Sequence, residues 1–231
     1  MQTLSAAFKF LTVWGCFTSA TPAPDTIGKA AGYFVYVGLV LGLLLALTNY
    51  ILTPYLAAEI LSLVLVALLI TVTGAQHLNG VKNTFDALAR NDKRADGALG
   101  FAAVALAILF KSAAIDSMDE RLSLSLLLTP VLARWALLIF LYGYHIRFDE
   151  TARAIAARVN LPPVLASTAA TLAFMAYFLG RKGLWIALAV SLFTLLLRGL
   201  LHRRHAVLSQ ASLGAAVELA ETLSLTLFAS F

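Results

Sequence analysis

Cysteine and charge are the scarcest features of this sequence. Its 231 residues include one cysteine, Cys16, and only 13% of them are Asp, Glu, Lys or Arg. A single cysteine excludes an intrachain disulfide and any cysteine-rich metal site. Soluble domains carry about twice this share of charged residues. Hydrophobic residues make up 61% of the chain and the mean hydropathy is +0.87, a composition typical of a polytopic membrane protein.

Acidic residues are fewer than basic ones, 12 against 17, which gives a net charge of +5. The basic residues are not interleaved with aromatic residues in the pattern of a nucleic-acid-binding module, so we expect no nucleic acid partner. In a membrane protein such an excess usually lies in cytoplasmic loops and meets anionic lipid headgroups. We therefore expect membrane lipid as a partner.

Long apolar runs divide the chain into about seven predicted spans, each close to the roughly 20 residues that a crossing requires. The predicted spans are 31–49, 54–72, 97–114, 122–142, 163–179, 184–197 and 211–231. Segment 1–30 has only a short apolar run and is predicted to be interfacial, and 143–160 reads as an amphipathic surface helix. The predicted fold is all-α, a single transmembrane helical bundle over residues 1–231 without linkers or internal repeats.

The distribution of lysine and arginine predicts the orientation of the bundle. The loops after the second, fourth and sixth predicted spans hold ten Lys and Arg, whereas the loops after the first, third and fifth hold three. Basic loops stay in the cytoplasm. We expect an inner (plasma) membrane protein whose N-terminus and segment 73–96 are cytoplasmic and whose C-terminus is outside.

The longest polar interruption is segment 73–96, TGAQHLNGVKNTFDALARNDKRAD. If this segment is helical, Asn79, Asn83, Asp86 and Arg90 share one face. Carboxylates on such a face would bind Mg²⁺ and bridge it to substrate phosphates. Two of these positions are amides, which ligate a cation without bringing charge, so we expect weakened metal binding.

A central motif and five further segments, in chain order, resemble the cobalamin synthase family of adenosylcobinamide-GDP ribazoletransferases. The family motif H-x-D-G-x-x-D-T-x-D-G is matched at His77, Gly80, Thr84 and Asp86, while Asn79 and Asn83 replace its first two aspartates. Further similar segments are Phe10-Leu11-Thr12, Tyr33-Phe34 with Gly38 and Gly42, Gly97–Gly100, Pro130–Ala136, and Leu213–Leu219 with Glu221. An expected T-G-D is replaced by Ser209-Gln210-Ala211.

The resemblance implies a Mg²⁺-assisted reaction that joins adenosylcobinamide-GDP to α-ribazole or its 5′-phosphate and releases GMP. Such transfers rely on positioning and on cationic neutralisation of the phosphates. Under this reading the substrate is a phosphate-bearing cobinamide nucleotide. Loss of carboxylates at Asn79, Asn83 and Ala211 leaves a second reading open, in which the chain is a non-catalytic structural or binding subunit of a membrane protein complex.

The predicted site consists of His77, Asp86, Arg134, Glu218 and Glu221. Asp86 and the two glutamates are the predicted Mg²⁺ ligands, Arg134 is predicted to hold phosphate, and His77 is predicted to act as a ligand or general base. Each assignment has an alternative: His77 as a hydrogen-bonded residue at a helix start, Asp86 as a solvated charge, and Arg134 as the ion-pair partner of the glutamates.

A basic cluster at Arg203 and Arg204, with His202 and His205 beside them, has two interpretations. The guanidinium groups could bind the phosphates of a nucleotide. Alternatively they anchor the chain to lipid headgroups on the cytoplasmic side. The sequence leaves both open.

Overall fold

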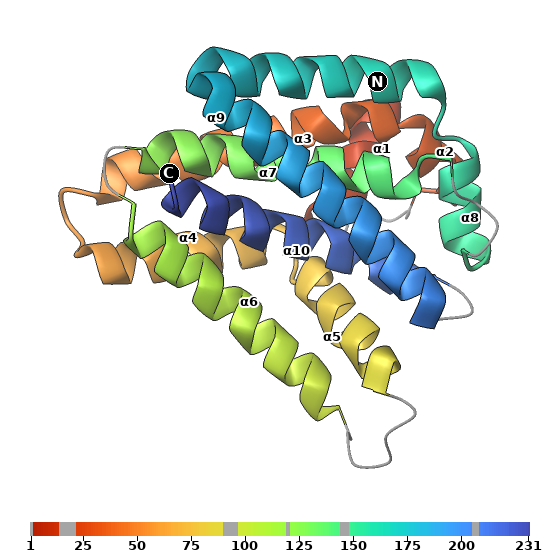
Figure 1. The fold of residues 1–231 in the computed structure, drawn as a ribbon, viewed down its shortest axis with the longest axis horizontal. Helices are drawn as coiled ribbons and strands as arrows, with labels where there is room; N and C mark the ends of the chain where they lie inside the picture. Colours follow the sequence, from red (N-terminus) through yellow and green to blue (C-terminus); the bar gives the residue numbers. More distant parts are fainter. Residues whose placement is uncertain (1, 14–21, 90–96, 119–120, 144–147, 205–207) are drawn as a thin grey trace.

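The computed structural model describes residues 2–13, 22–89, 97–118, 121–143, 148–204 and 208–231. These residues form helices and connecting turns and contain no β-strand, which confirms the all-α prediction (Figure 1). The elements are α1 (Gln2–Leu11), α2 (Pro24–Lys29), the 3-10 turn η2 (Ala31–Tyr33), α3 (Phe34–Leu52), α4 (Ala58–Val72), α5 (Gln76–Ala89), α6 (Ala98–Asp116), α7 (Leu122–Leu141), α8 (Glu150–Ala157), α9 (Leu161–Arg204) and α10 (Gln210–Ala229).

Five stretches of the described chain are helical, long and apolar enough to cross a membrane: η2 with α3, and α6, α7, α9 and α10. A sixth candidate arises if α4 and α5, which meet at 86°, are one broken span. The protein is therefore a polytopic helical membrane protein. The predicted number of seven spans stays a prediction, because α4 has only 15 residues on its own.

Helix α9 covers two of the predicted spans. It has 44 residues, but the backbone breaks at Gly180, where φ is 57° and ψ is −134°. A residue with a side chain rarely adopts this conformation, so glycine permits the reversal seen in Figure 1. The break lies between the predicted spans 163–179 and 184–197, so the two halves of α9 can be separate spans.

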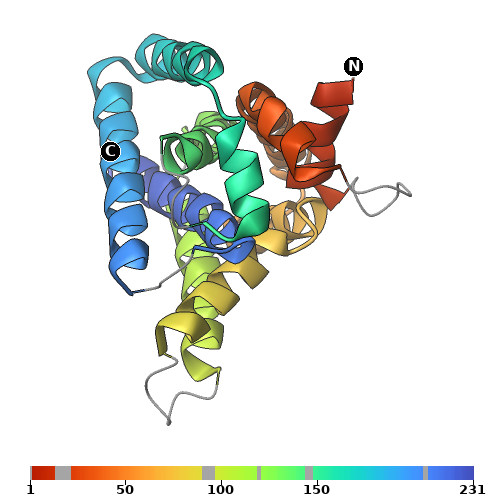
Figure 2. The same cartoon turned by 90° about the vertical axis from the view of Figure 1, so that its right-hand side faces the viewer.

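Helices α7 and α10 form the centre of the bundle, with α3 on one side and α9 on the other (Figure 2). A side chain at Gly38 or Gly42 of α3 would overlap the α7 backbone at Pro130 and Leu127, so these glycines allow the two helices to pack in close contact. Trp135 Nε1 donates to Thr168 Oγ1 at 2.9 Å and connects α7 to α9. Exposed leucines such as Leu43 and Leu196 cover the outside, as expected for a surface that faces lipid.

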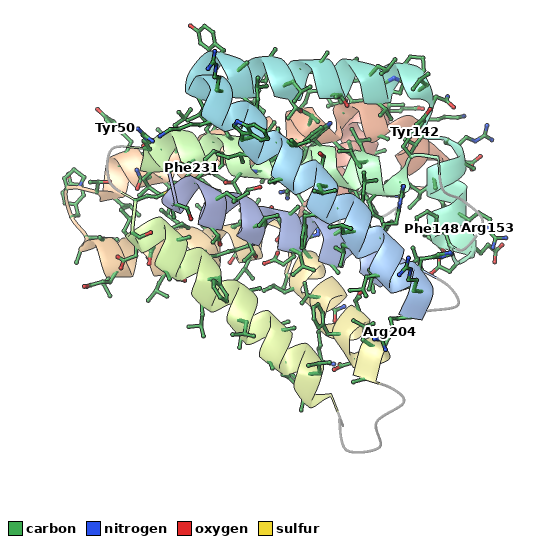
Figure 3. The ribbon with its side chains drawn as sticks, in the orientation of Figure 1. Tyr50, Tyr142, Phe148, Arg153, Arg204 and Phe231 are labelled. Carbon is green, nitrogen blue, oxygen red and sulfur yellow. The ribbon has the colours of Figure 1, made fainter. Side chains whose placement is uncertain are left out.

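Polar contacts gather the connecting segments at two opposite ends (Figure 3). At one end, Arg121 and Lys182 donate to the Phe231 carbonyl oxygen at 2.8 and 3.2 Å. At the other end, Phe148 forms a bridge with Leu208, and the Asp149 amide donates to the Leu208 carbonyl at 2.8 Å. Segments that the charge distribution assigned to one side of the membrane therefore lie at one end of the molecule.

Helices α1 and α2, within the predicted interfacial segment 1–30, pack against the bundle. Phe10 of α1 stacks on Phe34 of α3 at a centroid distance of 5.7 Å. Arg158, at the end of α8, donates to Asp25 of α2 at 2.8 and 3.2 Å, and these bonds lower the pKa of the Asp25 carboxyl. Neither α1 nor α2 is long enough to cross the membrane.

Candidate functional site

Residues 76–89 of the polar segment are a regular helix, α5, rather than a loop. The chain enters α5 through Gly74 and Ala75, whose φ angles of 61° and 54° are left-handed. These two residues produce the sharp bend between α4 and α5. The predicted sharing of one helix face therefore holds for Asn79, Asn83 and Asp86, whereas Arg90 lies outside the described residues.

Two glycines set the distance between α5 and α10. A Cβ added at Gly80 would lie 2.7 Å from the Ala211 carbonyl oxygen and 2.8 Å from the Ala215 amide nitrogen. A Cβ at Gly214 would lie 3.2 Å from the Gln76 carbonyl oxygen. The two backbones thus touch, and this contact places the motif residues of α5 beside the first turn of α10.

A cavity of about 630 Å³ opens beside this contact. Its volume is within the range of small-molecule sites, roughly 300–1,000 Å³. Helices α1, α2, α5, α7, α8 and α10 all contribute to the lining. Asn79, Asn83 and Ala211, where the family pattern would have carboxylates, line this one cavity together with His77. The polar side chains of the lining are those of Lys9, Gln76, His77, Asn79, Asn83, Thr151 and Gln210.

Four charged side chains form a buried network in the core. Lys111 Nζ of α6 lies 2.6 Å from both Glu218 Oε1 and Glu221 Oε2, and Arg134 Nη1 of α7 pairs with Glu221 Oε1. Lys111 is 2% exposed, and Arg134 and Glu221 are fully buried. Two cations thus balance two anions, as low-dielectric surroundings require. The predicted pairing of Arg134 with Glu221 is present.

His77 connects the cavity with this network. Its side chain is buried and lines the cavity, and its Nε2 lies 3.5 Å from Arg134 Nη2. A guanidinium only donates hydrogen bonds, so neutral His77 accepts at Nε2 and carries its proton on Nδ1. This arrangement favours the interpretation of His77 as a hydrogen-bonded positioning residue. The assignment of His77 as a general base stays a prediction.

Asp86 lies elsewhere, at the contact between α5 and α6. Its Oδ2 pairs with Lys82 Nζ at 2.9 Å, and its Oδ1 accepts from the Gly100 amide at 2.8 Å. Glu218 and Glu221 are held in the core by Lys111 and Arg134. No group of three His, Cys, Asp or Glu side chains in the described chain could hold a metal ion. The residues present therefore do not fit the expected Mg²⁺ site, because its three predicted ligands do not converge.

The other predicted phosphate-binding residues do not reach the cavity either. Arg134 is fully buried and absent from the lining, and Arg203 and Arg204 are exposed at the end of α9. Their exposure fits the anchoring interpretation as well as it fits phosphate binding. His205 lies outside the described residues.

Two candidate functional residues, Lys111 and Lys9, were not identified from the sequence. Lys111 lies within a predicted span, and a lysine between apolar runs is itself a signal of a buried partner. Lys9 lies in the short apolar run of segment 1–30, and it lines the cavity. Nothing in the sequence alone indicates that α1 would fold back onto α5 and α10.

Comparisons with known proteins show the family to which the chain belongs. The family model described as cobalamin-5-phosphate synthase matches residues 3–229. An adenosylcobinamide-GDP ribazoletransferase of Geotalea daltonii is 30% identical over 95% of this chain and 93% of its own length. Proteins of the same name are 31% identical in Stutzerimonas stutzeri, over 96% of this chain and 95% of theirs, and 28% identical in Pseudomonas fluorescens Pf-5, over 94% of each. No solved structure matches the chain.

Proposed function

Because the chain belongs to the cobalamin-5-phosphate synthase family, we propose that it transfers a cobinamide phosphoryl group from adenosylcobinamide-GDP to α-ribazole or its 5′-phosphate. The observation that carries the proposal is the cavity at the α5–α10 contact. The family's motif positions His77, Asn79, Gly80 and Asn83 all line it, and so do Ala211 and Gly214. A cavity assembled from the motif positions of two distant segments is the expected place for the reaction.

In the proposed step, a ribose hydroxyl of α-ribazole attacks the phosphorus that carries the cobinamide. A new phosphorus–oxygen bond forms, the bond to the bridging oxygen of the diphosphate breaks, and GMP leaves with that oxygen. The hydroxyl proton passes to solvent or to a group in the cavity. The contribution of the protein is positioning and electrostatic stabilisation of the transferred phosphoryl group.

The polar residues that line the cavity and the buried charged network have different proposed roles. Gln76, Asn79, Asn83 and Gln210 offer amide donors to phosphate oxygens, and Lys9 offers a positive charge. His77 is fixed by Arg134 and in turn by Glu221, so the buried network positions its ring at the wall of the cavity. Because Asp86, Glu218 and Glu221 are paired elsewhere, we assign no step to a metal ion.

Purified protein in detergent, incubated with adenosylcobinamide-GDP and α-ribazole, tests the proposal. GMP release above that of mock-purified membranes is the expected result, with the joined cobamide as the second product. A His77→Ala variant should lower kcat without abolishing folding, which the elution volume on gel filtration checks. Failure to form either product at any concentration of Mg²⁺ would remove the transferase proposal.

One observation favours a second candidate. All three carboxylate losses, at Asn79, Asn83 and Ala211, fall in the same cavity, which is where drift after loss of catalysis would gather. In that case the protein is a structural or binding subunit of a membrane complex. Mild solubilisation of native membranes should then yield a fixed partner in constant stoichiometry. A monodisperse lone protomer would count against this candidate.

For location we propose the inner (plasma) membrane, with the cavity open to the cytoplasm. The support is the concentration of basic residues in the segments at the cavity end of the molecule. Adenosylcobinamide-GDP and α-ribazole are charged or polar, so an aqueous opening on the cytoplasmic side would give both access.

A further inference from the structure

The charges that line the cavity are of one sign. Among its described lining residues, Lys9 is the single permanently charged side chain, and none is Asp or Glu. Three carboxylates near the lining are otherwise engaged: Asp25 pairs with Arg158, Asp86 pairs with Lys82, and Asp149 accepts from the Ala152 and Gln210 amides. Glu150, which precedes the lining residue Thr151, is exposed and is not part of the lining. The described lining therefore brings one positive charge and no negative charge to the cavity at neutral pH.

Lys9 differs from four other cations of the described chain in having no carboxylate partner. Within the part of the chain that the structure describes, Lys111, Arg134, Lys82 and Arg158 each have a carboxylate partner, whereas Lys9 has none. An ammonium at the wall of a cavity and without a counter-ion attracts an anion. Lys9 is partly buried, so its charge is less screened than that of a surface lysine.

Neutral donors and helix ends add to this attraction. Asn83 Nδ2 donates to Asn79 Oδ1 at 3.4 Å, a weak contact that a ligand oxygen could replace. Helices α5 and α10 both begin at the cavity, with Gln76 and Gln210 in its lining. The positive end of a helix dipole favours negative charge nearby.

A cavity lined by carboxylates and a cavity lined by amides differ in their electrostatic interaction with a phosphate. Aspartates at positions 79, 83 and 211 would repel phosphate oxygens, and a divalent cation would be required to bridge the like charges. Asn79, Asn83 and Ala211 bring no such repulsion. The same substitutions that remove the metal ligands therefore remove the need for a metal in binding.

We infer that this cavity binds the diphosphate of a nucleotide directly, without a divalent cation, with Lys9 supplying the charge that Mg²⁺ would otherwise supply. The inference rests on the proposed function for its choice of ligand. It concerns binding and makes no claim about turnover, so the two can fail separately.

Calorimetric titration of the detergent-solubilised full-length protein with GDP, in EDTA and in Mg²⁺, tests the inference. We expect the same affinity in both conditions. Lys9→Gln should weaken binding about tenfold, the effect of one charge-assisted hydrogen bond. Lys29→Gln is the matched control, because Lys29 is exposed on neighbouring α2 and outside the cavity lining, and it should bind GDP like the unmodified chain.

A variant that restores the carboxylates should make GDP binding dependent on Mg²⁺. The triple variant Asn79→Asp, Asn83→Asp, Ala211→Asp should lose GDP binding in EDTA and regain it with Mg²⁺, a difference of at least about tenfold given the close like charges. Binding by the unmodified chain only in Mg²⁺, or no binding in either condition, overturns the inference. The GMP-release assay in Mg²⁺ decides the proposed function independently of these outcomes.

Discussion

At the scale of single residues, the most consequential feature is the pairing of charges in the core. Glu221 contacts both Lys111 and Arg134, whereas Glu218 contacts Lys111 alone and without hydrogen-bond geometry. Charges in such surroundings are costly unless each has a partner. Both buried cations of the network therefore have Glu221 as a carboxylate partner.

Replacing Glu221 should accordingly be more harmful than replacing Glu218. Glu221→Gln leaves buried Arg134 without a carboxylate partner and Lys111 with Glu218 alone, which costs about 3–5 kcal/mol and lowers the unfolding temperature by about 10 °C. Glu218→Gln should lower it by less than half of that amount. Thermal unfolding in detergent measures both. Asp25→Asn is the control, because the exposed Asp25–Arg158 pair contributes little. Equal effects of the two glutamate variants would contradict the central place of Glu221.

Sequence reasoning anticipated part of this network. Arg134, Glu218 and Glu221 stood out because charges are rare within apolar runs. Lys111 obeys the same rule but was overlooked inside its apolar run, and so the balance of charges was missed. The proposed convergence of Asp86 with the glutamates could not be checked from spacing. Residues on separate helices meet only as packing dictates, and Asp86 instead pairs with Lys82, one helical turn earlier on α5.

At the scale of helices, α5 depends on its contact with α10. Gly80→Ala would press a methyl group into the α10 backbone at Ala211 and Ala215. We expect a loss of about 1–3 kcal/mol, together with weaker ligand binding because the cavity wall shifts. Thermal unfolding and GDP titration measure the two effects.

Gly199 supplies the control for this change. It lies in α9, and a Cβ there would meet nothing within 4 Å. Gly199→Ala should therefore be neutral or stabilise the protein by up to about 1 kcal/mol through helix propensity. If both alanine variants behave alike, the close approach of α5 and α10 is not what holds the cavity.

Asp149 joins two helix starts. Its Oδ1 accepts from the Ala152 amide at 2.8 Å at the start of α8, and its Oδ2 lies 3.4 Å from the Gln210 amide at the start of α10. Asp149→Ala should cost about 1–2 kcal/mol in unfolding free energy, since it removes a cap, whereas Asp149→Asn caps comparably well and should cost much less. Thermal unfolding of the two variants, compared side by side, measures this. An asparagine variant as unstable as the alanine variant would show that charge, rather than capping, is what matters.

The helices themselves were more predictable than their boundaries. Apolar runs located α3, α6, α7 and α10 within a few residues, because a span is a property of local composition. Helix α5 was only conditionally predicted, since its propensity is weakened by Asn and Gly and its stability comes from packing on α10. The amphipathic segment 143–160 contains a helix, α8, of only 8 residues.

At the scale of the whole molecule, the contacts at the two ends agree with the alternation that the charge distribution predicts. Tyr55 lies in the turn between α3 and α4, at the outer end of the second predicted span, and Arg181 belongs to a connection assigned to the outside. Glu150 and Arg203 belong to segments assigned to the cytoplasm. All four are exposed. Arg181 directly follows the break at Gly180, so the side of the membrane on which Arg181 is exposed shows whether α9 crosses the membrane twice.

Single-cysteine labelling in whole cells tests this arrangement. In a Cys16→Ser background, Tyr55→Cys and Arg181→Cys should react with a membrane-impermeant maleimide added outside. Glu150→Cys and Arg203→Cys should react only after the membrane is permeabilised. The unsubstituted Cys16→Ser protein controls for background labelling. Reaction of Arg181→Cys only after permeabilisation would mean that α9 does not reach the outer surface at Gly180, and reaction of Glu150→Cys in intact cells would place the cavity on the wrong side for cytoplasmic substrates.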